Sequence, residues 1–326
     1  MKSIEKNTTT SRDIGEFIGV EAGMRTNTIL RKFSLVIAVV FLLMAFFVFS
    51  NKSHAVANTP DVSAQAIVLL ECSTNTVLYS KSAHVKLPMA STTKVMTALV
   101  AIRHGNLDTM VEIPDEAIGV EGSSIFLQKG EKLTLRDLLY GLMLRSGNDA
   151  AIAIAYHFGG SIDGFAMLMN ETAKSVGAMN TNFVNPHGLP AENHYTTAYD
   201  LALICSEAIR NETFKTIVSA QYHRTTTGYA PRTMMNKNKL LWDYEGGIGI
   251  KTGFTKAAGK CLTFAAERNG MTVVGVVLNC PNMFPDAQEL LNYSFYNYEM
   301  YVIVRKGTVV LRVDVDRSNG QLLPLV

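Results

Sequence analysis

Strand-like segments occur in two groups separated by a long helical stretch, and this distribution most constrains the fold. Apolar runs at 66–70 and 77–79 flank Ser73-Thr74-Asn75 and predict an early hairpin. Three more strands are predicted after Gly246, at 248–252, 261–266 and 271–278. The last two are joined through Asn269-Gly270, a strong signal for a tight turn. We therefore expect an α/β (α+β) fold in which both groups contribute to one antiparallel sheet covered by helices.

The intervening stretch is predicted to be helical. One helix is predicted to begin at Pro88 and to continue to Ile102. Beyond Lys94 it is apolar nearly all round, so we expect it to pass through the core. Thr134 and Asp137 resemble a capping box at the start of a second helix, which breaks within 145–148. Further helices are predicted at 149–158, 162–176, 198–210, 213–219 and 286–297.

The N-terminal segment has the order of features found in an export signal. Arg31 and Lys32 precede the apolar run 35–49, and Ala55-Val56-Ala57 follows as a small-residue cleavage site. Residues 1–57 are therefore predicted to be an export signal cut after Ala57, with an uncleaved membrane anchor as the alternative. Translation could begin at Met1 or Met24. Under both interpretations the remaining chain lies outside the cytoplasm, secreted or attached to the outer face of the cell membrane.

The rest of the chain divides into a main domain, 58–297, and a short C-terminal segment, 298–326. In the second, Tyr301–Arg305 and Val309–Val315 predict a hairpin around Lys306-Gly307. We interpret it as the start of a small β module. A truncated module and a minimal variant are both compatible with this pattern.

Composition excludes several classes of function. The chain has 326 residues and a net charge of +2, with no basic stripe, so no nucleic acid is expected as a partner. The histidines form no metal-ligand motif: His187 is expected in a turn with its ring satisfied, and His194 in a loop, so neither a metal nor a cofactor is predicted. The cysteines are expected to be buried free thiols, with a disulfide framework as the alternative: Cys72, Cys205, Cys261 and Cys280.

The first candidate catalytic motif is Ser91-Thr92-Thr93-Lys94. In a helix, residues three apart share a face, which places Lys94 one turn above Ser91. The first helical turn favours negative charge near the Ser91 hydroxyl. A lysine walled by apolar neighbours loses solvation, so its pKa falls and it can act as a neutral base toward Ser91. The alternative is an N-cap serine followed by a surface lysine.

The second motif, Ser146-Gly147-Asn148, lies in the predicted break between two helices. A hydroxyl there can relay a proton between Lys94 and a leaving amine, and the Asn148 amide can hold a substrate carbonyl. The alternative is an ordinary helix–helix turn, since Ser, Gly and Asn are common turn residues.

The third motif, Lys251-Thr252-Gly253, ends a predicted strand. The ammonium and hydroxyl suit the terminal carboxylate of a peptide, and Gly253 lets a substrate approach the backbone. The backbone N–H groups of Ser91 and Phe254 are the predicted oxyanion hole. An edge-strand lysine before a turn is the alternative.

Taken singly, these motifs are weak evidence. A Ser-x-x-Lys sequence is expected about once by chance in a chain of this length, whereas Lys-Thr-Gly is expected in only a few per cent of such chains. Their order and their placement on a buried helix, a loop and a strand end carry the specificity. Together they are the motif set of penicillin-binding proteins and serine β-lactamases.

Longer blocks around the motifs resemble the serine D-alanyl-D-alanine carboxypeptidases of the peptidase S11 family, which are low-molecular-mass penicillin-binding proteins. The resemblance covers roughly 62–297. It is carried by Leu87–Lys94, Gly122-Ser123-Ser124, Ser146–Ala151, Asn185–Leu189, His194–Asp200 and Gly249–Thr255.

This resemblance implies a five-stranded antiparallel sheet with helices on both faces, an all-helical lobe, and a site between them. It also implies that Ser91 attacks the carbonyl between two D-alanines of a peptidoglycan stem peptide, that water hydrolyses the acyl-enzyme, and that β-lactams acylate Ser91. Residues 58–297 are then the catalytic domain. Relatives often carry a carboxylate-binding arginine where this chain has Met283, so Lys251, Thr252 and Thr255 are expected to bind the carboxylate.

Two other functions remain open from the sequence. A β-lactamase would share the fold, but no glutamate occurs at a convincing Glu-x-x-x-Asn site for fast deacylation. A non-catalytic, peptidoglycan-binding or sporulation-associated scaffold would have no need of the intact motif residues. A vegetative and a sporulation role are equally compatible with the sequence.

Overall fold

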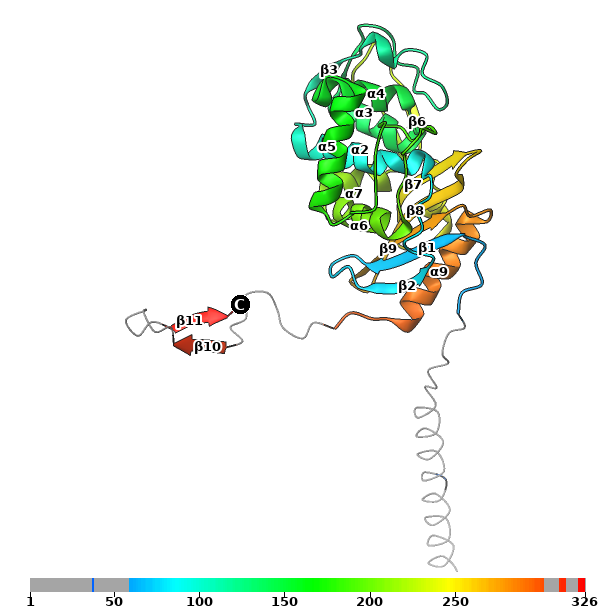
Figure 1. Ribbon diagram of the computed structural model, residues 1–326, viewed down its shortest axis with the longest axis vertical. Coiled ribbons are helices and arrows are strands. Elements are labelled where there is room, and N and C mark those ends of the chain that lie inside the picture. The colour runs from blue at the N-terminus through cyan, green and yellow to red at the C-terminus, as the bar shows by residue number, and fades with distance from the viewer. Residues whose placement is uncertain (1–36, 38–58, 302–310, 315–321, 326) are drawn as a thin grey trace, which may run out of the picture. The chain divides into compact units, whose positions relative to one another are not determined.

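The computed structural model describes Ile37 and residues 59–301, 311–314 and 322–325 (Figure 1). Apart from Ile37, the predicted export signal or anchor therefore lies outside the described residues. Within these residues no single helix is long and apolar enough to cross a membrane; one pair, Asn148–Gly159 and Ile162–Ser175, passes by length and composition but is bent by 83°.

The main domain is organised around a five-stranded antiparallel sheet with the order β2-β1-β9-β8-β7. Its strands are β1 (Ala66–Glu71), β2 (Val77–Lys81), β7 (Gly247–Thr255), β8 (Gly259–Arg268) and β9 (Met271–Leu278). The central strand β9 pairs with β1, so that Val68 lies opposite Val276. This confirms a single sheet assembled from segments on both sides of the helical stretch.

Helices cover both faces of the sheet. Successive side chains of each strand point to opposite faces, so the apolar residues of one strand pack against both helical layers. On one face, Val68 and Val276 belong to a core that includes α2 (Lys94–His104) and α6 (Ala198–Ile209). On the other, Ile67 and Val277 pack with α9 (Met283–Asn297). Every residue of β1 is buried, as expected for a strand covered on both faces.

The helical lobe lies between β2 and β7 in the sequence and is built around α2. Residues 94–101 of α2 are all buried, which confirms that this helix passes through the core. The lobe also contains α3 (Leu135–Tyr140), α4 (Asn148–Gly159), α5 (Ile162–Ser175) and α7 (Glu212–Ser219), of which α4, α5 and α7 contact α2. Thr134 Oγ1 accepts from the Asp137 N–H at 3.2 Å, so the predicted N-cap is present.

The structure corrects three details. The helix predicted from Pro88 begins at Lys94, after a 3-10 turn over Ala90–Thr93, because Ala90 has a left-handed φ of 49° that an α-helix cannot contain. The lobe is not all-helical. It contains two short antiparallel ladders, whose three-residue strands are too short to show an alternating pattern: β3 (Met110–Glu112) with β4 (Lys132–Thr134), and β5 (Tyr222–Arg224) with β6 (Thr233–Met235).

The third correction concerns the C-terminal segment. Strand β10 (Leu311–Asp314) lies within the predicted strand at 309–315, and it pairs with β11 (Leu322–Leu325), which was not predicted. The predicted partner strand, apart from Tyr301, and the predicted turn lie outside the described residues.

All four cysteines are buried and free, which confirms the prediction of unpaired thiols. Burial raises the pKa of the Cys261 thiol to about 11 and that of Cys280 to about 12. These thiols therefore stay protonated at neutral pH and are poor nucleophiles.

Candidate active site

Ser91 lies in the 3-10 turn that precedes α2, beside a tightly constrained backbone. The left-handed Ala90 comes directly before it. Gly188, itself at a φ of +89°, lies against this turn so closely that a Cβ there would be 1.9 Å from the Ala90 carbonyl oxygen. Only glycine fits at that contact. The position of Ser91 is therefore held by a backbone-to-backbone contact as well as by α2.

Lys94 has no exposed surface, and three oxygens enclose its side-chain nitrogen. Its Nζ lies 3.1 Å from Ser91 Oγ, 2.7 Å from Asn148 Oδ1 and 2.6 Å from the His187 carbonyl oxygen. Asn148 Nδ2 donates to the Glu121 carbonyl at 2.5 Å, which fixes the orientation of the Asn148 amide. Two of the three oxygens around Nζ are therefore pure acceptors.

This arrangement suits a neutral amine. Such an amine has two hydrogens and one lone pair, and the two carbonyl-type oxygens accept both hydrogens. The lone pair then faces Ser91, whose hydroxyl can donate to it. Burial holds the pKa of Lys94 well below its usual range, the charge of Lys251 lowers it further, and Asp149 acts in the opposite direction. The structure thus places beside Ser91 an amine that is able to act as a general base.

His187 contributes its backbone carbonyl to this site. Its ring Nδ1 accepts from the Leu189 N–H at 3.2 Å, and burial lowers the pKa of His187 to about 3. The ring is therefore neutral, with its hydrogen on Nε2. His194 was expected in a loop, and it is buried. Its Nε2 lies 2.9 Å from Thr93 Oγ1, and burial lowers the pKa of His194 to about 4. Both rings are therefore neutral and only weakly basic at neutral pH.

Ser146 follows a π-helical turn over Gly141–Arg145 and adopts a left-handed φ of 66°. It is buried, and it lines the same pocket as Ser91. Among the hydrogen bonds of the described residues none joins Ser146 Oγ to Lys94 Nζ, so its role as a proton relay stays a prediction. The Asn148 side chain is bound at both ends by the protein, and its role toward a substrate carbonyl also stays a prediction.

Asp149 fixes the segment that forms one wall of this pocket. Its carboxylate accepts from Ser124 Oγ at 2.5 Å and from the backbone N–H groups of Ile125 and Leu127 at 3.0 and 3.1 Å. Ser123, just before this segment, lines the pocket. A buried carboxylate with several donors orders the loop strongly, because each charge-assisted bond is stronger than a neutral one.

Strand β7 forms the opposite wall. Lys251 is buried, and its Nζ donates to the Thr252 carbonyl at 3.0 Å. Burial and the charge of Lys237 lower the pKa of Lys251 to about 7. A Cβ on Gly253 would be 3.1 Å from the Ser91 backbone nitrogen, so this glycine lets β7 approach the nucleophile turn. That proximity is compatible with the predicted oxyanion hole of Ser91 and Phe254 N–H groups.

Thr255 differs from the other predicted residues of this strand. Its Oγ1 accepts from the Ala258 N–H at 3.0 Å within the β7–β8 turn. Thr252, Gly253 and Phe254 line the pocket, whereas Thr255 is not among its lining residues. Its part in carboxylate binding stays a prediction.

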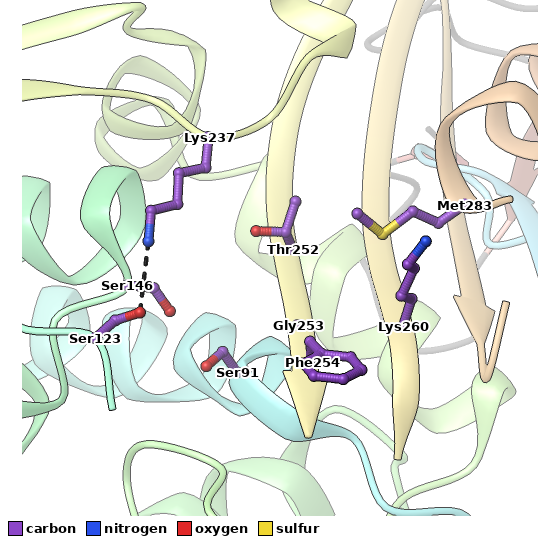
Figure 2. A pocket seen from close by; sticks show the side chains of 9 residues that line it. All are labelled: Ser91, Ser123, Ser146, Lys237, Thr252, Gly253, Phe254, Lys260 and Met283. Carbon is purple, nitrogen blue, oxygen red and sulfur yellow. Dashed lines mark hydrogen bonds between the residues drawn. The ribbon is translucent and has the colours of Figure 1, made fainter. Parts of the chain in front are cut away.

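Figure 2 shows the pocket between these walls, with Ser91, Ser146 and Thr252 directed into it. Its volume is about 490 Å³. Two of its lining residues, Lys237 and Lys260, belong to no motif in the sequence, whereas Ser123 belongs to a block that carries the family resemblance. Lys237 Nζ donates to Ser123 Oγ at 3.4 Å, and burial lowers its pKa. Each comes from a segment without a catalytic motif, so only the folded chain brings them together.

Met283, at the first position of α9, also lines the pocket, and Lys260 from β8 lines the same side (Figure 2). The position at which the family resemblance led us to expect an arginine is therefore occupied by an apolar side chain, and Lys260 supplies a cation on the same side of the pocket. In the part of the chain that the structure describes, no group of three or more His, Cys, Asp or Glu side chains is arranged to hold a metal ion.

Comparison with known proteins agrees with this geometry. The family model for D-alanyl-D-alanine carboxypeptidase, peptidase S11, matches residues 53–282. The D-alanyl-D-alanine carboxypeptidase DacF of Bacillus subtilis is 32% identical over 90% of this chain and 77% of its own length. The D-alanyl-D-alanine carboxypeptidase of Streptomyces sp. strain K15 is 38% identical over 72% of this chain and 88% of its own length.

Solved structures show the same relationship. The Streptomyces K15 DD-transpeptidase is 37% identical and superposes with a TM-score of 0.70, covering 73% of this chain and 99% of that one. A D-alanyl-D-alanine carboxypeptidase from Mycobacterium tuberculosis is 32% identical, with a TM-score of 0.70 over 74% of this chain and 94% of that one. The fold is therefore that of the penicillin-binding-protein type of DD-peptidase. The chain belongs to the peptidase S11 family of D-alanyl-D-alanine carboxypeptidases, which are serine hydrolases.

Proposed function

We propose that this protein removes the terminal D-alanine from peptidoglycan stem peptides through an acyl-enzyme on Ser91. The observation that carries the proposal is the fully buried Lys94, whose Nζ lies 3.1 Å from Ser91 Oγ, with its two other hydrogen-bonding positions occupied by carbonyl-type oxygens. A serine paired in this way with a neutral amine is an activated nucleophile.

In the acylation step, Lys94 takes the hydroxyl proton as Ser91 Oγ attacks the carbonyl carbon between the two D-alanines. The N–H groups of Ser91 and Phe254 stabilise the oxyanion of the tetrahedral intermediate. The C–N bond then breaks, and the proton passes from Lys94, through Ser146, to the amine of the departing D-alanine. This leaves an ester on Ser91.

In the deacylation step, water attacks the ester carbonyl and gives a proton to Lys94. The ester C–O bond breaks, and the proton on Lys94 returns to Ser91 Oγ. The shortened peptide leaves as a carboxylic acid.

Recognition of the substrate rests on its terminal carboxylate. The pocket offers the Thr252 hydroxyl and the ammonium groups of Lys237 and Lys260, and Lys251 lies buried beside it. Several cations around one hydroxyl-lined wall suit a carboxylate, which accepts charge-assisted hydrogen bonds. We propose that Lys260 supplies a positive charge from β8 on the side where Met283 supplies none.

A β-lactam would follow the same acylation, with Ser91 Oγ opening the ring amide. The ring nitrogen stays attached to the acyl group, so the leaving amine cannot diffuse away. No carboxylate occurs among the residues that line the pocket, as far as the structure describes them, so no glutamate is in place to activate water as in class A β-lactamases. This favours a long-lived penicilloyl ester over rapid turnover.

We also propose a place of action on the basis of the N-terminal sequence. The charged, apolar and small-residue order within 31–57 supports export and action on the outer face of the cytoplasmic membrane, where peptidoglycan lies.

The decisive test incubates the purified chain with a peptide ending in D-Ala-D-Ala and measures free D-alanine, in parallel with labelling by a fluorescent penicillin. We expect D-alanine release and stable labelling, and the loss of both in Ser91→Ala. Unchanged release or labelling in that variant would refute the nucleophile. Rapid loss of the label with turnover of penicillin would instead indicate a β-lactamase, and absence of both activities in the folded chain would indicate a scaffold.

A further inference from the structure

A second pocket, with a volume of about 470 Å³, opens beside the first, and Lys237 lines both. Its walls come from the β5–β6 ladder, where Tyr222 lies opposite Met235, and from Trp242 on α8 (Leu240–Asp243). None of these side chains has a part in the proposed reaction. The volume lies within the range of sites that hold small ligands.

Two aromatic rings at nearly a right angle dominate this second pocket. The Tyr222 and Trp242 ring centroids are 6.4 Å apart, with an interplanar angle of 82°. The two residues keep 58% and 42% of their surface exposed, and Met235 keeps 48%. Single exposed apolar side chains are ordinary, but a cluster that lines a concave surface indicates a binding site.

The polar groups around the rings carry charges of both signs. Lys239 and Asp243 line the pocket, and neither takes part in a salt bridge among the described residues. Lys237 lines the pocket as well, so an anion would meet one group of its own sign and a cation would meet two. Neutral hydroxyl groups both donate and accept hydrogen bonds, so they can use the ammonium and the carboxylate together.

We infer that this second pocket binds a sugar ring of the peptidoglycan glycan strand while the first pocket holds the peptide. A pyranose presents apolar C–H faces that pack on aromatic rings, and hydroxyls that fit Lys239 and Asp243. Lys237 lines both pockets, so they are close enough for one extended substrate to reach both. The inference rests on the proposed function, since it assigns the carrier of the peptide that Ser91 cleaves.

The kinetic test uses two substrates with the same stem peptide ending in D-Ala-D-Ala, one free and one attached to its disaccharide. We expect kcat/KM to be about tenfold higher for the glycan-linked substrate, which corresponds to one hydrogen-bonded, stacked sugar. Trp242→Ala and Tyr222→Ala should remove that advantage and leave hydrolysis of the free peptide unchanged. Trp242→Phe, which retains a ring, should keep most of it.

A matched control is Tyr296→Ala, because Tyr296 is 59% exposed on α9 and does not line either pocket. It should retain the full advantage of the glycan-linked substrate. An equal loss in Tyr296→Ala, or equal kcat/KM for both substrates in the unmodified chain, would overturn the inference.

Binding is measured separately through Trp242, which is the single tryptophan of the chain and so reports on this pocket alone. Titration with an N-acetylglucosamine oligomer should give a saturable change in its emission, and the sugar-free peptide should give none. A change with the peptide and not with the sugar would overturn the assignment in favour of a peptide site. Because this readout needs no turnover, a positive titration without D-alanine release would support the sugar site while refuting the proposed function.

Discussion

Replacement of Gly188 by alanine tests whether the nucleophile is held by its backbone surroundings. In the structure, a Cβ at this position would lie 1.9 Å from the Ala90 carbonyl oxygen and 2.4 Å from its carbon. Both are backbone atoms, so no side chain can rotate away. The contact must open from 1.9 Å to at least 3.0 Å, and Ala90 is bonded directly to Ser91.

The size of the effect follows from that displacement. A shift of about 1 Å at reacting groups typically lowers a catalytic rate about 10²-fold, which is about 2.7 kcal/mol in the activation free energy. The left-handed φ of +89° adds a second penalty of about 1–2 kcal/mol in stability, because alanine disfavours this region. We therefore expect kcat/KM to fall at least about 10²-fold while the protein still folds.

A glycine without the contact separates these two effects. Gly270 has a φ of +77° and no atom within 4 Å of the place where a Cβ would lie, so Gly270→Ala carries the backbone penalty alone. The assay compares D-alanine release, the rate of penicillin acylation and thermal unfolding for both variants. Both should lose similar backbone stability, and only Gly188→Ala should lose acylation. Equal acylation rates in the two variants would refute the proposed backbone positioning of Ser91.

Three further predictions concern charge in and around the site. The pKa of Lys251 is about 7, so its positive charge is present below that pH and lost above it. KM for a peptide with a free carboxylate should therefore rise by up to about tenfold per pH unit above 7. KM for an amidated peptide should show no such rise. Asp149→Ala leaves the buried N–H groups of Ile125 and Leu127 without their acceptor, so urea unfolding should show a loss of about 2–5 kcal/mol; a loss below about 1 kcal/mol would contradict the ordering role. Lys260→Met should raise KM about fivefold with kcat unchanged, and an unchanged KM would exclude Lys260 from carboxylate binding.

Much of the fold was predictable because its signals are local. Alternating and continuous apolar runs identified all five strands of the sheet, and the Asn269-Gly270 turn does join β8 to β9. The buried character of α2 was visible in its all-round apolar sequence. That both groups of strands share one sheet was also inferable, since strands separated by a helical stretch need a common partner to bury their apolar faces, whereas the strand order was not predicted.

The details that failed depend on contacts between distant segments. The left-handed Ala90 is forced by its packing against Gly188, almost a hundred positions away, and no local pattern predicts a non-glycine residue at positive φ. Lys237 and Lys260 belong to no motif in the sequence. They become pocket residues because the segment between β6 and α8 places Lys237 there and β8 places Lys260 there. Contacts between distant segments thus determine the backbone conformation at Ala90 and the lining of the pocket, which local sequence patterns do not specify.

The pairing of β1 with β9 has a consequence for synthesis of the chain. Ala66 lies opposite Leu278, so about two hundred further residues must be synthesised after β1 before its partner strand β9 exists. Until then, this strand, which is apolar except for Glu71, has only β2 beside it and keeps one edge exposed. Emerging chains that stop before 271 would therefore expose an aggregation-prone edge, and refolding should be slow because its key contacts are distant in sequence.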